Sequence, residues 1–286
     1  MAPNTVAYAG RPCHWECTGA ALETTKKHAD PADITFLAMP FSSFSQRVWT
    51  ALEYLEIPYQ VRAINLFEPP KDLFILSPKG LVPALQLGNT SPPRGLNESL
   101  VILEYINELS ATKGNKKSLL PPPEYTWSRA LIRLQADLIS RTILPCFYRY
   151  VQCQEPSNQV QLLKEFLDGM EKLLQLFDRA EKEREENAPK FGLWQGGGSL
   201  SLADVLIVPW LHRGNVVLKH YRDFSWSILY PAYPRFETYL DRLLSLPAFQ
   251  ATCSTNEVLL DSYEMYAFNC CPSQIAKAIN KGRELP

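Results

Sequence analysis

The first part of the chain that is expected to be ordered contains two apolar runs typical of strands, with one segment of helical periodicity between them. Residues 34–38 are β-branched, aromatic and aliphatic, which predicts a buried strand. Apolar side chains recur at helical spacing over residues 46–56, and Ser45 before them suits a helix N-cap. Residues 59–64 return to the strand pattern. The order strand, helix, strand predicts the beginning of an α/β domain.

A second strand and helix follow a polar stretch. Residues 65–79 are polar and contain prolines, whereas residues 81–87 are apolar apart from Gln86 and include Pro83. Because proline cannot donate to a strand ladder, Pro83 marks an edge, a bulge or a cis peptide bond. Residues 88–95 are read as a turn-rich insertion, and a helical pattern begins after Glu98-Ser99.

The rest of the chain is helical in pattern. One apolar stripe covers residues 131–139, in a helix that Pro145 kinks or ends, and another runs from about 160 to 184. Ser201-Leu-Ala-Asp204 precedes an apolar run and matches a capping box with Asp in place of Glu.

These patterns predict an α/β domain followed by an all-α domain. Residues 1–32 carry no sustained apolar period and are predicted to be a flexible extension. The α/β domain is expected over residues 33–112, and the all-helical domain, with a C-terminal extension, over residues 120–286.

Composition favours a soluble cytosolic protein. The formal net charge of -1 gives no electrostatic basis for binding nucleic acid or an anionic membrane. No apolar run approaches the length of a membrane span, and the N-terminus lacks the apolar core of a secretion signal. The seven cysteines show no regular spacing, so we expect no disulfide framework. Cys13, His14 and Cys17 match no zinc pattern, so no metal site is expected.

Three short motifs carry a family resemblance. Phe41-Ser-Ser-Phe-Ser-Gln-Arg47, Gly80-Leu-Val-Pro83 and Asn97-Glu-Ser99 stand in the order and spacing of cytosolic glutathione transferases. The chain is most similar to the omega class and its fungal relatives, over roughly residues 33–286. The resemblance implies a thioredoxin-like N-terminal domain, a helical-bundle C-terminal domain and glutathione as co-substrate.

The resemblance also implies a set of glutathione-binding residues. The family's Val-Pro peptide is cis, and Val82, before Pro83, would pair its N–H and C=O with the cysteinyl backbone of glutathione. Glu98 and Ser99 would hold the γ-glutamyl end, where helix amides suit a carboxylate. Phe44 belongs to the same set. The omega pattern has a lysine where this chain has Pro69, and nearby Lys71 is the candidate for the glycyl carboxylate.

The predicted catalytic position departs from the omega class. Omega enzymes carry a cysteine where this chain has Ser42. A hydroxyl cannot form a mixed disulfide, so thiol–disulfide exchange is not expected from this position. It can donate a hydrogen bond to the glutathione sulfur and favour the thiolate. Ser43 competes for this role, and a purely structural serine turn remains an alternative.

An electrophile pocket is expected between the domains. For each predicted lining residue, a place in the core or on the surface without substrate contact is an alternative of at least equal weight; these residues are Phe41, Phe147, Tyr148, Trp210, His212 and Arg213.

The predicted activity is transfer of glutathione's sulfur to a hydrophobic electrophile, in detoxification or secondary metabolism. Alternatives are a glutathione-dependent isomerase or lyase, and a carrier of hydrophobic ligands that has lost turnover. Thiol transfer or dehydroascorbate reduction would need another cysteine, and Cys146 and Cys153 lie in the predicted helical domain. The resemblance further suggests a cytoplasmic homodimer.

Overall fold

The computed structural model describes residues 7–8, 11–12, 14, 16–88, 91–114 and 116–286. It divides into two compact units. The first contains the chain up to Ser118 together with Ser245–Ser262, and the second contains Leu119–Leu244 and Tyr263–Pro286. The segment Ser245–Ser262, predicted as part of the helical domain, therefore packs with the first unit.

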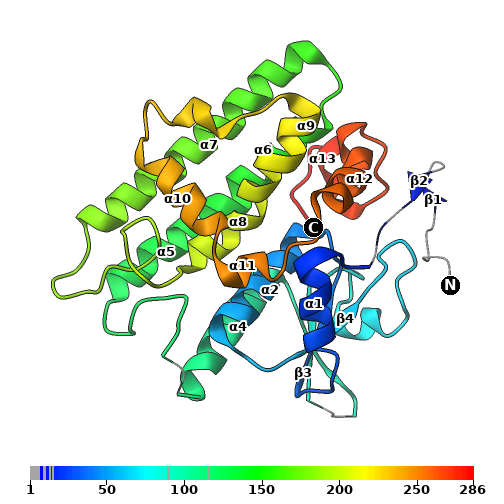
Figure 1. Ribbon diagram of the computed structural model, residues 1–286, viewed down its shortest axis with the longest axis horizontal. Coiled ribbons are helices and arrows are strands. Elements are labelled where there is room, and N and C mark those ends of the chain that lie inside the picture. Colours follow the sequence, from blue (N-terminus) through cyan, green and yellow to red (C-terminus); the bar gives the residue numbers. More distant parts are fainter. Residues whose placement is uncertain (1–6, 9–10, 13, 15, 89–90, 115) are drawn as a thin grey trace. The chain divides into compact units, whose positions relative to one another are not determined.

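A mixed sheet forms the centre of the first unit (Figure 1). Its strands lie in the order β4-β3-β5-β6, with β3 parallel to β4 and antiparallel to β5, which is antiparallel to β6. This arrangement confirms the predicted thioredoxin-like fold. The strand bounds are β3 (Ile34–Ala38), β4 (Gln60–Ala63), β5 (Ala84–Leu87) and β6 (Arg94–Asn97).

Strand β6 and helix α3 (Leu73–Leu76) occupy stretches read from the sequence as a turn-rich insertion and a polar loop. Gly95 lies within β6, where a Cβ atom would come 2.5 Å from the Cα of Leu76. The glycine is therefore needed for the close approach of α3 to the strand, not for a turn.

Two helices of the first unit pack against each other. Helix α2 (Ser43–Leu55) and helix α4 (Ser99–Thr112) lie side by side (Figure 1). Val48, Leu52 and Leu55 of α2 are all fully buried, as the helical spacing predicted.

Helix α1 (Gly19–Lys27) forms inside the segment predicted as a flexible extension. Its buried residues are only Ala21 and Thr24, which explains why the sequence showed no apolar stripe. Hydrogen bonds attach it instead: Ala21 N donates to Cys253 O (3.0 Å), and Thr24 Oγ1 donates to Ala251 O (2.7 Å). The remaining elements are β1 (Ala7–Tyr8), β2 (Arg11–Pro12) and α11 (Pro247–Gln250).

The second unit is helical, as predicted. In it α5 continues through a π-helical turn, η1, into α6, so Pro145 sits in the first turn of α6 and does not end the chain's helical path. Its core is aromatic, with Phe147, Phe166 and Trp226 all buried. Its elements are α5 (Thr126–Leu138), η1 (Ile139–Ile143), α6 (Leu144–Gln152), α7 (Pro156–Lys182), α8 (Leu202–Arg213), η2 (Gly214–Leu218), α9 (Lys219–Arg222), η3 (Trp226–Leu229), α10 (Arg235–Leu244) and α13 (Gln274–Asn280). Helix α12 (Asn256–Ala267) begins in the first unit and ends in the second.

The predicted capping box at the start of α8 is confirmed. Ser201 Oγ accepts from Asp204 N (3.1 Å), and Asp204 Oδ2 accepts from Ser201 N (2.8 Å). Leu193 N also donates to Asp204 Oδ2 (3.0 Å), and the Tyr239 hydroxyl donates to Oδ1 (2.7 Å). The carboxylate thus joins the helix start to two other segments of the second unit.

Candidate functional site

The three motifs that carry the resemblance meet at one end of the sheet. The register pairs Leu37 of β3 with Ala84 of β5, and Ala84 with Asn97 of β6. The chain leaves β3 at this row toward residues 41–47, enters β5 there after Val82-Pro83, and leaves β6 there into Glu98-Ser99. Segments distant in sequence are thus gathered along one edge of the first unit.

Ser42 caps helix α2, whereas Ser45 was predicted to do so. The Ser42 backbone is extended, and its Oγ accepts a hydrogen bond from Ser45 N (3.2 Å). The helix therefore begins at Ser43, before the apolar period becomes visible in the sequence. Because Ser42 Oγ is used as an acceptor, its own proton is left to donate.

Burial separates the two candidate serines. Ser42 is half-buried, whereas Ser43 is only 1% exposed and belongs to the packed body of α2. Phe44 is also partly exposed, while Phe41, predicted for the electrophile pocket, is buried. Of the two hydroxyl groups, that of Ser42 is the one within reach of a ligand.

Val82 lies two residues before Ala84, where the paired part of strand β5 begins. The Val82–Pro83 peptide bond is cis, one of the three geometries that the sequence allowed and the one implied by the resemblance. An extended peptide can add to such a strand end through main-chain hydrogen bonds.

Glu98 and Ser99 form the start of helix α4. Glu98, the N-cap residue, has a φ of 66°, uncommon for a residue other than glycine, and makes no side-chain cap. Ser99 is 6% exposed. Its hydroxyl accepts a hydrogen bond from Arg47 Nε (3.0 Å) and another from Arg47 Nη2. Arg47 is the last residue of the motif Phe41–Arg47, but the sequence suggested no role for it.

Lys79 supplies a cation that sequence reasoning missed. Its ammonium lies 3.1 Å from Glu98 Oε1, and it directly precedes Gly80 in the chain. Lys71, the predicted contact to the glycyl carboxylate, is exposed next to Asp72, which pairs with Arg62. The lysine expected in the loop before Gly80 was a signal that could have pointed to Lys79.

Most of the other predicted pocket residues lie inside the second unit. Phe147, Tyr148, Trp210 and Arg213 are each at most 2% exposed. The Phe147 ring packs 5.4 Å from that of Tyr148, centroid to centroid. Arg213 donates from Nε to the Tyr263 hydroxyl and from Nη1 to Pro209 O, both at 2.8 Å. This burial gives no support to a pocket role for the four, which stays a prediction.

His212 is held neutral by its surroundings. Desolvation by burial, with a smaller effect from the neighbouring Arg213 charge, lowers its pKa from 6.5 to about 4. The unfolded chain therefore binds this proton at a higher pH than the folded chain does. Stability from the neutral imidazole is present above pH 6.5 and is lost as the pH falls toward 4.

We expect His212→Gln to reduce the acid sensitivity of the fold. This histidine should account for about 2 kcal/mol of the stability lost between roughly pH 7 and pH 5. Urea unfolding at the two pH values measures the difference, and His220→Gln, which changes an exposed histidine, is the matched control. Equal pH dependence in both variants would contradict the prediction.

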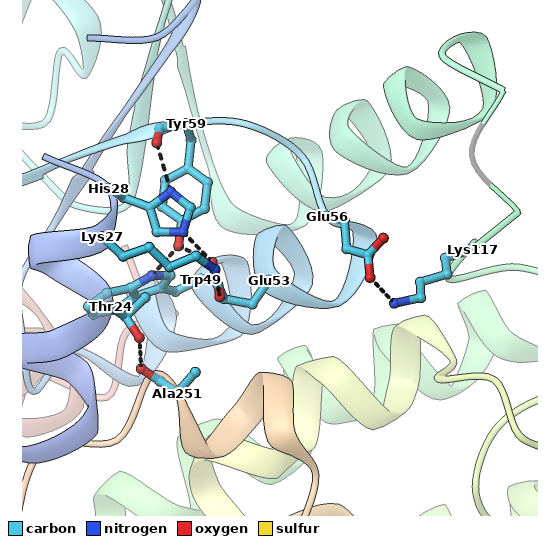
Figure 2. Close-up of polar contacts among 9 residues, drawn as sticks. All are labelled: Thr24, Lys27, His28, Trp49, Glu53, Glu56, Tyr59, Lys117 and Ala251. Carbon is cyan, nitrogen blue, oxygen red and sulfur yellow. Dashed lines mark hydrogen bonds and ion pairs between the residues drawn. The ribbon is translucent and has the colours of Figure 1, made fainter. Parts of the chain in front are cut away.

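A second polar cluster lies at the C-terminal end of α2 (Figure 2). The Glu53 carboxylate accepts from the Tyr59 hydroxyl (2.6 Å) and lies 2.9 Å from His28 Nε2. Trp49 Nε1 donates to the same hydroxyl (2.6 Å), and the His28 ring stacks on Tyr59. Burial and the Glu53 charge raise the Tyr59 pKa far above its usual range, so the phenol keeps its proton. An open cavity of ≈ 410 Å³ adjoins the cluster.

The cluster fastens α1 to the sheet, so Glu53→Ala should destabilise the first unit. The Tyr59 hydroxyl would lose its acceptor and His28 would lose its close contact with the carboxylate, at a cost of about 2–3 kcal/mol. Urea unfolding measures this cost. Glu23→Ala removes an exposed carboxylate paired with Lys26 and should change stability by less than about 0.5 kcal/mol. If Glu53→Ala lowers the free energy of unfolding as little as the control does, the polar cluster does not hold α1 against the sheet.

Cys13, from the Cys13-His14-Cys17 motif, lies outside the described residues. Within the described ranges, no group of three or more His, Cys, Asp or Glu side chains is placed to hold a metal ion. Nor does any helix in these ranges have the length and apolar character needed to cross a membrane.

Comparison with known proteins shows that the similarity extends beyond the three motifs to most of the chain. Residues 41–109 match the family model described as the glutathione S-transferase N-terminal domain. Glutathione S-transferase omega-1 of Sus scrofa is 30% identical over 200 residues, which cover 68% of this chain and 75% of the relative. A maleylacetoacetate isomerase of Aspergillus fumigatus is 30% identical over 178 residues, covering 59% of this chain and 71% of the isomerase.

A solved structure shares the fold of most of the chain. The crystal structure of glutathione transferase Omega 3C from Trametes versicolor superimposes with a TM-score of 0.72 and 28% identity. The alignment covers 89% of this chain and 98% of that protein.

Proposed function

The chain belongs to the glutathione transferase family, and from that premise we propose that it joins the thiolate of glutathione to a hydrophobic electrophile. The observation that carries the proposal is the meeting of three motifs at one end of the sheet. There the half-buried Ser42 hydroxyl has a proton left to donate.

Ser42 would act on the sulfur of glutathione. A free thiol has a pKa of about 8.5, so little thiolate is present at neutral pH. A hydrogen bond from Ser42 Oγ, together with the positive end of α2, favours the thiolate. The sulfur then forms a bond to the electrophilic carbon, and the leaving group departs with its electron pair. The reacting atoms all belong to the two substrates, and the protein supplies stabilisation and position.

The rest of glutathione would follow the sheet edge. Val82, before cis Pro83, offers its main chain to the cysteinyl residue. Ser99 and the first amides of α4 suit the γ-glutamyl carboxylate, and Glu98 suits the γ-glutamyl ammonium. Lys71 is the candidate cation for the glycyl carboxylate, and Lys79 pairs with Glu98.

Two other activities use the same binding site. A glutathione-dependent isomerase or lyase would employ the same thiolate, and one relative is named as an isomerase. A carrier of hydrophobic ligands would keep the fold without turnover. Ser42 separates this chain from enzymes that exchange disulfides through a cysteine at that position, since a hydroxyl forms no mixed disulfide.

A homodimer and a cytoplasmic location are part of the proposal. Three large apolar side chains of the first unit are exposed: Phe74 by 46%, Ile75 by 63% and Val101 by 51%. Contiguous exposed apolar patches are typical of association surfaces, and Phe74 and Ile75 are neighbours in α3. A role in detoxification or secondary metabolism, and kinship with fungal members, stay predictions.

The function is tested with the wild-type protein. We expect glutathione to bind in titration calorimetry and a halo-arene electrophile to be conjugated at a rate that rises with the thiolate fraction. Glutathione binding without conjugation would favour the isomerase, lyase or carrier. Absence of glutathione binding would contradict all of these proposals.

A further inference from the structure

Arg47 is a buried cation between two helices of the first unit. It belongs to α2, its side chain is 4% exposed, and α2 packs along α4 (Figure 1). Two of its N–H groups, on Nε and Nη2, donate to the hydroxyl of Ser99, the first residue of α4. Its guanidinium carbon also lies 4.8 Å from the centre of the Phe44 ring. One side chain therefore joins the turn near Ser42 to the start of α4.

The two hydrogen bonds decide what the Ser99 hydroxyl can offer to a ligand. A hydroxyl oxygen has two lone pairs and one proton. Arg47 directs an N–H group at that oxygen from each of two nitrogens, and these occupy both lone pairs. Ser99 is left with only its proton, so it can bind an acceptor such as a carboxylate and cannot bind an ammonium group. The buried positive charge acts in the same direction because the local dielectric is low.

We propose that Arg47 is a positioning residue that makes Ser99 a hydrogen-bond donor for the α-carboxylate of the γ-glutamyl group of glutathione. The inference rests on the proposed function and deepens it, because it assigns the specificity for that carboxylate to a residue that does not itself touch the ligand.

The test compares two ligands on three variants. One ligand is glutathione, and the other is γ-aminobutyryl-cysteinyl-glycine, which lacks only the α-carboxylate. By titration calorimetry, Arg47→Met should weaken glutathione binding about 10-fold and binding of the analogue less than about 3-fold. Ser99→Ala should show the same ligand dependence. In the double variant the two losses should not add, because both remove one donated hydrogen bond.

Controls separate this role from a structural one. Arg62→Met removes an exposed arginine paired with Asp72 and should leave the preference for glutathione over the analogue unchanged. If Arg47→Met does not fold, Arg47→Lys serves, with a smaller loss but the same ligand dependence. Equal weakening of both ligands would overturn the inference while leaving the proposed function intact. A wild-type protein that binds neither ligand would overturn both.

Discussion

Replacing Ser42 by alanine is expected to lower the rate of glutathione conjugation by about 10- to 100-fold near neutral pH. The hydroxyl that favours the thiolate would be lost, so the apparent pKa of bound glutathione should rise by about one to two units. Glutathione binding should persist, because the contacts proposed for Val82 and Ser99 do not involve the Ser42 hydroxyl. The measurement is the conjugation rate against pH, with binding followed by calorimetry.

Two further variants separate chemistry from helix capping. Ser42→Ala also removes the acceptor for Ser45 N, whereas glycine is nearly as good an N-cap residue as serine. Ser42→Gly should therefore lose activity with little loss of stability. Ser43→Ala, at a buried position, should keep the pH profile of the wild type. An active Ser42→Ala protein with an unchanged pH profile would transfer the role to Ser43 or to a backbone amide.

Replacing Asp204 by alanine should cause the largest loss of stability, about 4 kcal/mol or more. The carboxylate is 1% exposed and accepts from Ser201 N, Leu193 N and the Tyr239 hydroxyl. Its removal leaves three donors inside the protein without their acceptor, each at a cost of about 1–3 kcal/mol. Partial rearrangement and entry of water should reduce the sum. Urea unfolding of the full chain measures the change.

Asp241→Ala is the matched control, since that aspartate is exposed on α10 of the same unit. It should change stability by less than about 0.5 kcal/mol. The loss of stability caused by Asp204→Asn should fall between these two, because the asparagine amide keeps the shape of the carboxylate. Its NH2 group, however, would face a neighbouring hydrogen-bond donor. Similar stability of Asp204→Ala and Asp241→Ala would show that the capping box does not hold the second unit together.

Local patterns were sufficient to predict an α/β part followed by a helical part of the chain. The period of Val48, Leu52 and Leu55 predicted α2 because those positions share the buried face of one helix. The capping box at Ser201 was readable for the same reason, since both of its partners lie within one helical turn. The site motifs were found by their resemblance to a family. Their convergence in space follows from the register of the strands, which cannot be deduced from the sequence.

Longer-range contacts decided the features that the sequence missed. Gly95 was read as a turn residue, but it lies within strand β6. Glycine is needed at this position because the backbone of Leu76 leaves no room for a side chain. Helix α1 shows no apolar stripe, since hydrogen bonds to residues 251 and 253 hold it. The sequence suggested no role for Arg47, and the role proposed for it rests on its contact with Ser99, 52 residues away.

The sequence by itself therefore determined strands β3, β4 and β5, the long helices with an apolar stripe, and the family that the motifs resemble, because all of these depend on spacing within a few residues. The tertiary structure alone decided that Ser42 is half-buried while Ser43 is buried, that Arg47 meets Ser99, and that four predicted pocket residues are packed inside the helical unit. Burial and hydrogen-bond partners depend on segments far apart in the chain, and no local pattern records them.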